Sequence, residues 1–272
     1  MARYDTKEHQ AMRSYRLLRL GSLLLAVFAA LACGVIVTPA AQAGEAPFIT
    51  VEGMRLAAGQ SREVAGKLFS ANSRLAAGGI VLTCRKAEAK PGAKLNGSNA
   101  GEAATGEAIG RLSECTVTGN GVGCKVVKEE VETQPLRAEL VEDAATKKKL
   151  LVDVLPASGS LFETLHFEGS GCTIKDTKVT GRDELVEVET DPGEKTIELG
   201  GVKEEAESWL GEVEKEQPSS FWLVKGGVGK VVEIEEAEKL LAFGVPAQLE
   251  GTALILLAKE GKSTKEKWSP VP

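Results

Sequence analysis

Four cysteines outside the N-terminal apolar run are the residues whose type and spacing point most directly to chemistry. They are Cys84, Cys115, Cys124 and Cys172, and the gaps between them are about 31, 9 and 48 residues. Zinc sites usually take their ligands in close pairs such as C-x2-C with histidine nearby, a pattern that this chain lacks. The lack of any C-x-x-C also excludes a thioredoxin-like redox site. The spacing therefore favours two disulfides, and free buried cysteines are the alternative.

The four cysteines allow three disulfide connectivities, and the residues alone leave all three open. We favour sequential pairing, Cys84 with Cys115 and Cys124 with Cys172, because it closes two moderate loops that do not overlap. In the chain-entropy account each loop would stabilise the fold by about 3–4 kcal/mol. Disulfides persist outside the reducing cytosol, so the cysteines also predict an exported protein.

Residues 225–230, KGGVGK, match the start of the deviant Walker A motif, K-G-G-x-G-K-[ST]. Nucleotide chemistry would need a serine or threonine next in the chain to hold magnesium, and Val231 stands there. Only about 40 residues follow, too few for the rest of a nucleotide-hydrolysing domain. We interpret 225–230 as a glycine-rich hairpin turn.

Catalysis by a serine nucleophile would have to use His166, the one histidine after the first 43 residues. It lies in the middle of a predicted strand, which favours a histidine that faces solvent or is hydrogen-bonded in the sheet. Gly169-Ser170-Gly171 lacks the outer spacing of G-x-S-x-G. Acidic residues are frequent, so a hydrolase that uses two carboxylates remains the alternative to a non-catalytic protein. The glutamates with the pattern of solvated faces are Glu204, Glu205, Glu212, Glu214, Glu235 and Glu236.

The N-terminus has the features of an export signal. Basic residues precede an apolar run over 20–37, which is followed by Ala41-Gln42-Ala43, a small-x-small cleavage site. We predict a signal peptide over 1–43 that is cleaved after Ala43. The run of about 18 residues is long enough to span a bilayer, so an uncleaved membrane anchor is the alternative. A lipoprotein acylated at Cys33 is a third interpretation, although Ala30 stands where a lipobox normally has leucine.

The charge balance limits the classes of partner. The chain has a formal net charge of −6, and its first 43 residues carry five basic and two acidic side chains, which leaves −9 on the remainder. That charge argues against nucleic acid or anionic lipid as a main partner, since phosphate groups bind to basic faces. We expect a protein in the extracellular space or the cell envelope, with membrane contact only through an uncleaved 20–37 segment.

Short segments with alternating apolar residues, separated by glycine-rich turns, predict a mainly β domain over 44–272. Hairpins are expected around 120–121, 144–147, 191–194 and 226–229. The number and spacing of the strands favour an antiparallel sandwich or a partly open barrel. Residues 202–216 differ, because their apolar residues recur at helical spacing and predict one amphipathic helix. A separate C-terminal subdomain from about residue 201 is the alternative to a single domain.

Four short motifs carry a family resemblance: Glu114–Val117, Gly121–Cys124, Thr133–Leu136 and Phe167–Cys172. They make residues 75–185 similar to a group of uncharacterised exported proteins of high-GC soil bacteria, which have a signal sequence followed by a cysteine-bounded β region. The resemblance implies export and a β fold and carries no activity. We therefore expect a non-catalytic binding, envelope-associated or structural module, with no cofactor and no metal site, whose ligand lies outside the cell.

Overall fold

The computed structural model describes residues 45–68, 72–145, 149–174, 176–181, 184–188, 193–199, 202–213, 220–234, 239–260 and 262–272. The predicted signal segment 1–43, with Cys33 and the cleavage site at Ala43, lies outside the described residues. Residues 42–272 form one compact unit. No helix long and apolar enough to cross a membrane occurs in the described part of the chain.

All regular elements in the described ranges are β-strands, which confirms the prediction of a mainly β fold. In chain order they are β1 (Phe48–Val51), β2 (Met54–Arg55), β3 (Ser61–Leu68), β4 (Ser73–Ala77), β5 (Ile80–Ala89), β6 (Lys94–Asn96), β7 (Thr105–Ala108), β8 (Gly110–Gly119), β9 (Lys125–Val126), β10 (Glu130–Glu132), β11 (Leu136–Asp143), β12 (Leu150–Pro156), β13 (Leu161–Leu165), β14 (Phe167–Glu168), β15 (Thr177–Thr180), β16 (Glu184–Val188), β17 (Gly193–Leu199), β18 (Val202–Val213), β19 (Ser220–Lys225), β20 (Val228–Glu233), β21 (Leu241–Ala242), β22 (Val245–Glu250), β23 (Thr252–Lys259), β24 (Lys262–Ser263) and β25 (Trp268–Val271).

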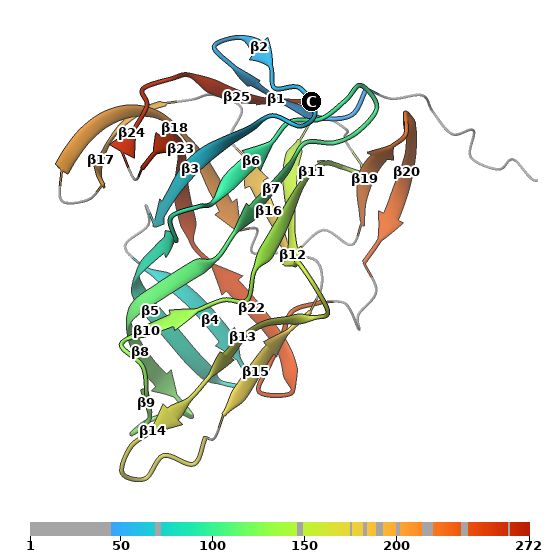
Figure 1. Ribbon diagram of the computed structural model, residues 1–272. Helices are drawn as coiled ribbons and strands as arrows, with labels where there is room; N and C mark the ends of the chain where they lie inside the picture. The colour runs from blue at the N-terminus through green and yellow to red at the C-terminus, as the bar shows by residue number, and fades with distance from the viewer. Residues whose placement is uncertain are drawn as a thin grey trace, which may run out of the picture. The chain divides into compact units, whose positions relative to one another are not determined.

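Most of these strands belong to one antiparallel sheet that curls into a half-barrel (Figure 1). Of the two predicted architectures, the partly open barrel is the closer one. A three-stranded sheet, β2-β1-β25, joins the start of the described chain to its end, and β9 pairs with β14 as a separate ribbon. Strands from the C-terminal part pair with early ones, β22 with β4 and β23 with β3. The segment after residue 201 therefore contributes to the same sheet as the N-terminal strands.

One apolar cluster, which we call the main core, collects buried side chains from β4, β5, β13 and β15. Its most buried members include Leu82, Leu165 and Val179, each at most 3% exposed. Residues directly opposite each other in an antiparallel pair point to the same face, so facing strands deliver their apolar side chains to one place. Burying a leucine of this kind contributes about 2 kcal/mol to folding.

Residues 202–213 form strand β18 in the structure, where the sequence pattern predicted a helix over 202–216. The strand pairs with β17 along its first part and with β16 and β23 further on. Hydrogen bonding to neighbours on both sides is a tertiary effect, and it can outweigh the local preference of a segment. Residues 214–216 lie outside the described ranges.

Two of the four expected hairpins are confirmed, and two are corrected. β11 pairs with β12, and β19 pairs with β20. Around 120–121 the chain turns back as expected, but β9, directly after the turn, pairs with β14, and it is the later strand β10 that pairs antiparallel with β8. The hairpin expected around 191–194 is wrong, because β16 and β17 each pair with β18. Turn residues mark where a chain reverses, but they do not choose the neighbour of the strand that follows.

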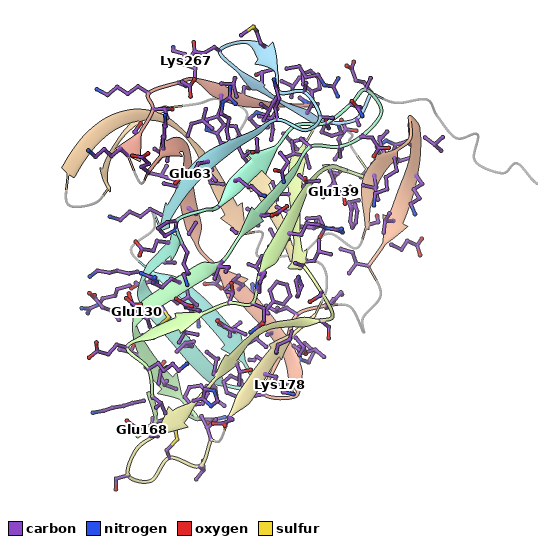
Figure 2. All side chains as sticks on the ribbon, viewed as in Figure 1. Glu63, Glu130, Glu139, Glu168, Lys178 and Lys267 are labelled. Carbon is purple, nitrogen blue, oxygen red and sulfur yellow. A yellow bond between two sulfur atoms is a disulfide. The ribbon has the colours of Figure 1, made fainter. Side chains whose placement is uncertain are left out.

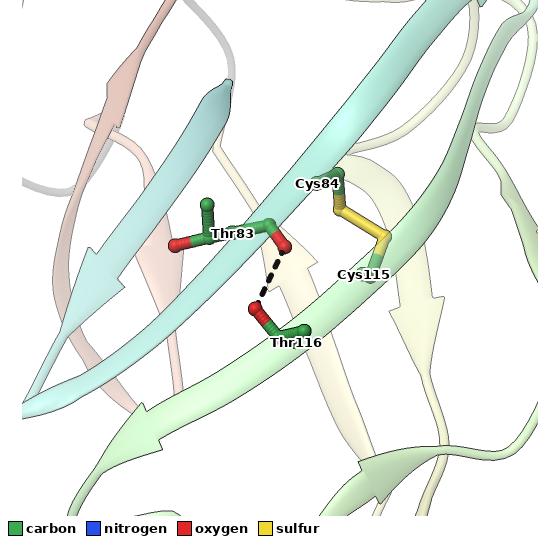
Figure 3. Close-up of a disulfide and its surroundings, with 4 residues drawn as sticks. All are labelled: Thr83, Cys84, Cys115 and Thr116. Carbon is green, nitrogen blue, oxygen red and sulfur yellow. Dashed lines mark hydrogen bonds between the residues drawn. A yellow bond between two sulfur atoms is a disulfide. The ribbon is translucent and has the colours of Figure 1, made fainter. Parts of the chain in front are cut away.

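The disulfide between Cys84 and Cys115 links β5 to β8 at directly opposite positions, with the two Cα atoms 4.0 Å apart (Figure 3). This is closer than the usual disulfide range of about 4.4–6.8 Å, and short separations are typical of directly opposed strand residues. Next to it the Thr116 hydroxyl donates a hydrogen bond to the carbonyl oxygen of Thr83, 3.4 Å away. The second disulfide joins Cys124 to Cys172. Both pairs follow the sequential connectivity.

Replacing both Cys84 and Cys115 by alanine is expected to lower the free energy of unfolding by about 2–5 kcal/mol, because the unfolded chain regains the freedom of a closed loop. Urea denaturation followed by circular dichroism measures the change. The Cys124→Ala, Cys172→Ala double variant is the comparison. Peptide mapping without reductant that found free Cys84 and Cys115 thiols in the purified protein would contradict the assignment.

Candidate functional site

The clearest surface site is formed where the second disulfide joins two loops. We call residues 119–127, together with residues 166–174 and Asp176, the disulfide end. Cys124 and Cys172 have Cα atoms 4.7 Å apart. The amide of Val127 donates to the carbonyl oxygen of His166 at 2.9 Å. Gly169 has a φ of 140°, and a Cβ there would overlap the carbonyl oxygen of Gly123, so only glycine lets the two loops approach this closely.

An open hollow of about 530 Å³ lies at the disulfide end. Its aromatic wall, Phe167, has its ring centroid 5.9 Å from that of Phe243. Two exposed apolar side chains belong to the same end, Val122 at 77% and Val127 at 47% exposure. Figure 2 labels Glu168 on β14 at this end of the sheet. The residues that line the hollow are Phe167, Glu168, Gly169, Cys172, Ile174 and Asp176.

His166 and Asp176 are in contact beside the hollow, with Nδ1 and Oδ1 2.9 Å apart. The sequence analysis expected a solvent-facing or hydrogen-bonded His166, and the structure has it half-exposed and paired with Asp176. The pair follows from the β13–β15 ladder: Leu165 lies opposite Thr177, so the next residue of each strand is brought together. An imidazole whose Nδ1–H donates to a carboxylate presents Nε2 as an acceptor. Nothing in the sequence marked Asp176 as the partner.

Glu163, on strand β13 just before His166, is the most unusual polar residue near the hollow. It is 5% exposed, and its Oε2 atom has no hydrogen-bond partner. It lies opposite Val179, and the register shifts between Leu161 and Glu163. Burial alone raises the pKa of its carboxyl from 4.5 to about 7. A carboxyl of this kind is neutral in the apolar core under mildly acidic conditions. In the sequence, Glu163 is the acidic exception in a run whose other alternate residues, Leu161, Leu165 and Phe167, are apolar.

A second group of buried acids lies under the β19–β20 hairpin. Glu139 and Asp153 are 7% and 5% exposed and lie directly opposite each other on β11 and β12. The Lys225 ammonium is 3.7 Å from Glu139 Oε1, and Figure 2 labels Glu139 beside the hairpin. On the same hairpin face, Phe221 and Leu223 pack in the apolar cluster that covers β11 and β12. The hairpin therefore separates the two acids from solvent.

The KGGVGK segment is a hairpin turn, as predicted from the sequence. Gly226 and Gly227 connect β19 to β20 with φ of 60° and 72°, the left-handed values that a two-residue hairpin turn needs. The Gly226 amide donates to Glu102 Oε1 at 2.9 Å, and the Gly227 amide donates to the carbonyl oxygen of Gly101 at 2.9 Å. Amides that already bind a carboxylate and a carbonyl oxygen are not free to hold phosphate.

Charged side chains on the outer face of β5, β8 and β10 form a network of ion pairs. The Arg111 guanidinium lies 3.6, 3.4 and 3.7 Å from carboxylate oxygens of Glu88, Glu130 and Glu132. A hydrogen bond from Lys90 holds the pKa of Glu132 below its usual value. Exposed pairs of this kind each contribute little to stability. Much of the acidic charge of this face is therefore matched by bases.

The six glutamates that the sequence analysis assigned to solvated faces lie on β18 or outside the described residues. Those of β18, Glu204, Glu205 and Glu212, are described by their backbone, and Glu214, Glu235 and Glu236 lie outside the described residues. Among the residues that the structure describes, no three histidine, cysteine or acidic side chains are grouped so that they would hold a metal ion.

Comparison of the chain with protein-family models, with curated proteins and with solved structures gave no match.

Replacing Gly229 by alanine is expected to destabilise the protein by about 1–3 kcal/mol, because the added Cβ would overlap the indole ring of Trp222. Trp222 is 9% exposed and packs against Ala46 and Ala103, so its ring has little room to move. Urea denaturation measures the loss. Gly66→Ala is the matched control, since its Cβ would meet Ala89 at an ordinary 3.5 Å. Equal stability of the two variants would show that the hairpin packs differently.

Proposed function

We propose that the protein is an exported, non-catalytic β module and that its disulfide end binds a partner outside the cell. The observation that carries the proposal is the combination at this end of an open hollow, exposed Val122 and Val127, and a disulfide that links the two loops. Apolar side chains this exposed next to a hollow are typical of interaction sites. Loops fixed by a covalent link also lose less entropy when they bind.

The lining of the hollow supports a partner of defined chemistry. Ile174 and Phe167 offer apolar surface, and the exposed carboxyl groups of Glu168 and Asp176 offer negative charge beside it. The part of the chain after residue 43 carries a formal charge of −9, which attracts cations at long range. We therefore propose a peptide that presents lysine or arginine next to apolar side chains as the class of ligand.

Three lines of support favour export. The two disulfides are stable in an oxidising compartment, and the predicted signal segment 1–43 provides a route to one. The resemblance of residues 75–185 to exported proteins of high-GC soil bacteria points the same way. An uncleaved anchor over 20–37 would give the same exposure to the outside with attachment to the membrane.

The alternative function is a secreted hydrolase that acts through two carboxylates. It is favoured by the opposed acids Glu139 and Asp153 on neighbouring strands. Both side chains lie under the β19–β20 hairpin, so a substrate would reach them only after that hairpin moved. A hydrolysis screen on glycans and peptides separates the two functions, since Glu139→Gln would abolish turnover by a hydrolase and leave binding at the disulfide end unchanged.

Binding can be tested with a labelled peptide of alternating lysine and leucine, followed by fluorescence polarisation. We expect saturable binding that Val122→Asp weakens by about tenfold or more, because it removes an exposed apolar contact. Glu168→Gln should also weaken binding and reduce its dependence on salt.

Met54→Asp is the matched control, because Met54 is 71% exposed on the separate β2-β1-β25 sheet. A peptide of alternating serine and lysine tests whether charge alone is enough. Equal binding by the Val122→Asp and Met54→Asp variants, or no binding by the unmodified protein, would refute the proposed surface.

A further inference from the structure

Glu163 and the hollow are connected through one short ladder. β13 and β15 pair through four residue pairs, of which Glu163 with Val179 is one and Leu165 with Thr177 is the last. His166 and Asp176 follow immediately, and the contact between their side chains closes the ladder beside the hollow. A change that loosens the ladder at Glu163 therefore acts on the positions of both hollow residues.

We propose that Glu163 is a proton-operated latch: the ladder is closed while its carboxyl is neutral, and ionisation opens the ladder and separates His166 from Asp176. The opening itself follows from the burial of Glu163. Its consequence for ligand binding rests on the proposed function, because it makes the disulfide end bind in a pH-dependent way.

The cost of ionising Glu163 in place comes from its surroundings. Leu165 and Val179 belong to the main core, and the Oε2 atom of Glu163 has no hydrogen-bond partner. A carboxylate in an apolar environment loses its hydration and gains no compensating contact. Opening the ladder lets water reach the charge, so the open state is favoured once the group ionises.

Among the described residues, no neighbouring charge offsets this effect. On β15, Lys178 is exposed and points away from the core, as do Glu130 and Glu132 on β10. On β12, Val154 packs against the main core, so Asp153 next to it points to the opposite face. His166 and Asp176 are paired with each other at the end of the ladder. Burial is accordingly the one cause of the raised pKa of Glu163.

The direction of the pH effect follows from proton binding. The closed ladder holds the Glu163 proton up to a pKa of about 7, and the open ladder releases it at the ordinary value of 4.5. The stabilisation that this proton gives to the closed ladder is therefore fully present below about pH 4.5. It is lost progressively as the pH rises to about 7 and does not return above that value. Linkage predicts that the open fraction increases roughly 50-fold between pH 5 and pH 8.

The ladder is weakly attached to the rest of the sheet, which makes local opening the expected response. Its register shifts between Leu161 and Glu163, and β15 is held to β21 by the single pair Thr180 with Leu241. In contrast, β5 and β8 pair through nine residues each and share a disulfide. Thinly paired segments open at lower free energy than the main ladders of a sheet.

Hydrogen exchange with mass spectrometry on the disulfide-bonded exported protein tests the latch. Labelling times are corrected for the intrinsic pH dependence of exchange, and peptides that cover β13 and β15 are compared with those that cover β5 and β8. We expect protection of β13 and β15 to fall roughly 50-fold from pH 5 to pH 8, with little change in β5 and β8.

Glu163→Gln, which keeps the shape and removes the charge, should abolish this pH dependence. His166→Asn, in which the histidine no longer titrates, should retain it. An unmodified protein with constant protection, or a Glu163→Gln variant that responds to pH as before, would overturn the proposal. A carbon NMR titration of the Glu163 carboxyl needs no variant, and a midpoint near 4.5 would overturn it as well.

The lysine–leucine peptide then connects the latch to binding. We expect it to bind more weakly at pH 8 than at pH 5 in the unmodified protein and equally at both values in Glu163→Gln. If the peptide binds at neither pH while the exchange result holds, the proposed ligand is wrong and the latch stands. If it binds equally at both values in the unmodified protein, the latch does not control the hollow.

Discussion

Both disulfides lie in the main core, and the rest of the structure depends on this arrangement. Cys84 and Cys124 are buried in it, and Cys115 and Cys172 pack against it. The cluster thereby ties together strands that are far apart in the sequence, from β4 to β22. A chain with only 4% aromatic residues has few large side chains to fill an interior, and covalent links supply part of the missing stability.

The main core also explains why the buried Glu163 and the open hollow lie on consecutive strands, β13 and β14. β13 buries Leu165 and Glu163 in the interior, and β14, which follows it, contributes Phe167 and Glu168 to the lining of the hollow. Phe167 is itself a member of the main core. A buried carboxyl without a partner lowers stability, and sites of this kind are found where a structure has a functional requirement beyond stability. We therefore relate the buried carboxyl of Glu163 to the function proposed for the hollow.

Several polar groups elsewhere in the described residues have a structural explanation. Glycine amides at the hairpin tip are bound by Glu102 and Gly101, and Arg111 is surrounded by three glutamates. Lys225 reaches the buried Glu139. These contacts stabilise the hairpin and the outer sheet face. The disulfide end therefore remains the candidate for function.

The sequence alone determined the features that depend on neighbouring residues or on simple chain statistics. Alternating apolar residues predicted strands, the Gly226-Gly227 pair predicted its turn, and cysteine spacing without a metal pattern predicted two disulfides. Only the tertiary structure decided which strands pair. It made Val202–Val213 a strand, moved β9 from β8 to β14, brought Asp176 to His166 and enclosed Glu163 in the core. The physical reason is that a strand has unsatisfied hydrogen bonds on both edges, so its neighbours are chosen by packing across the whole sheet and not by the residues beside it in the chain.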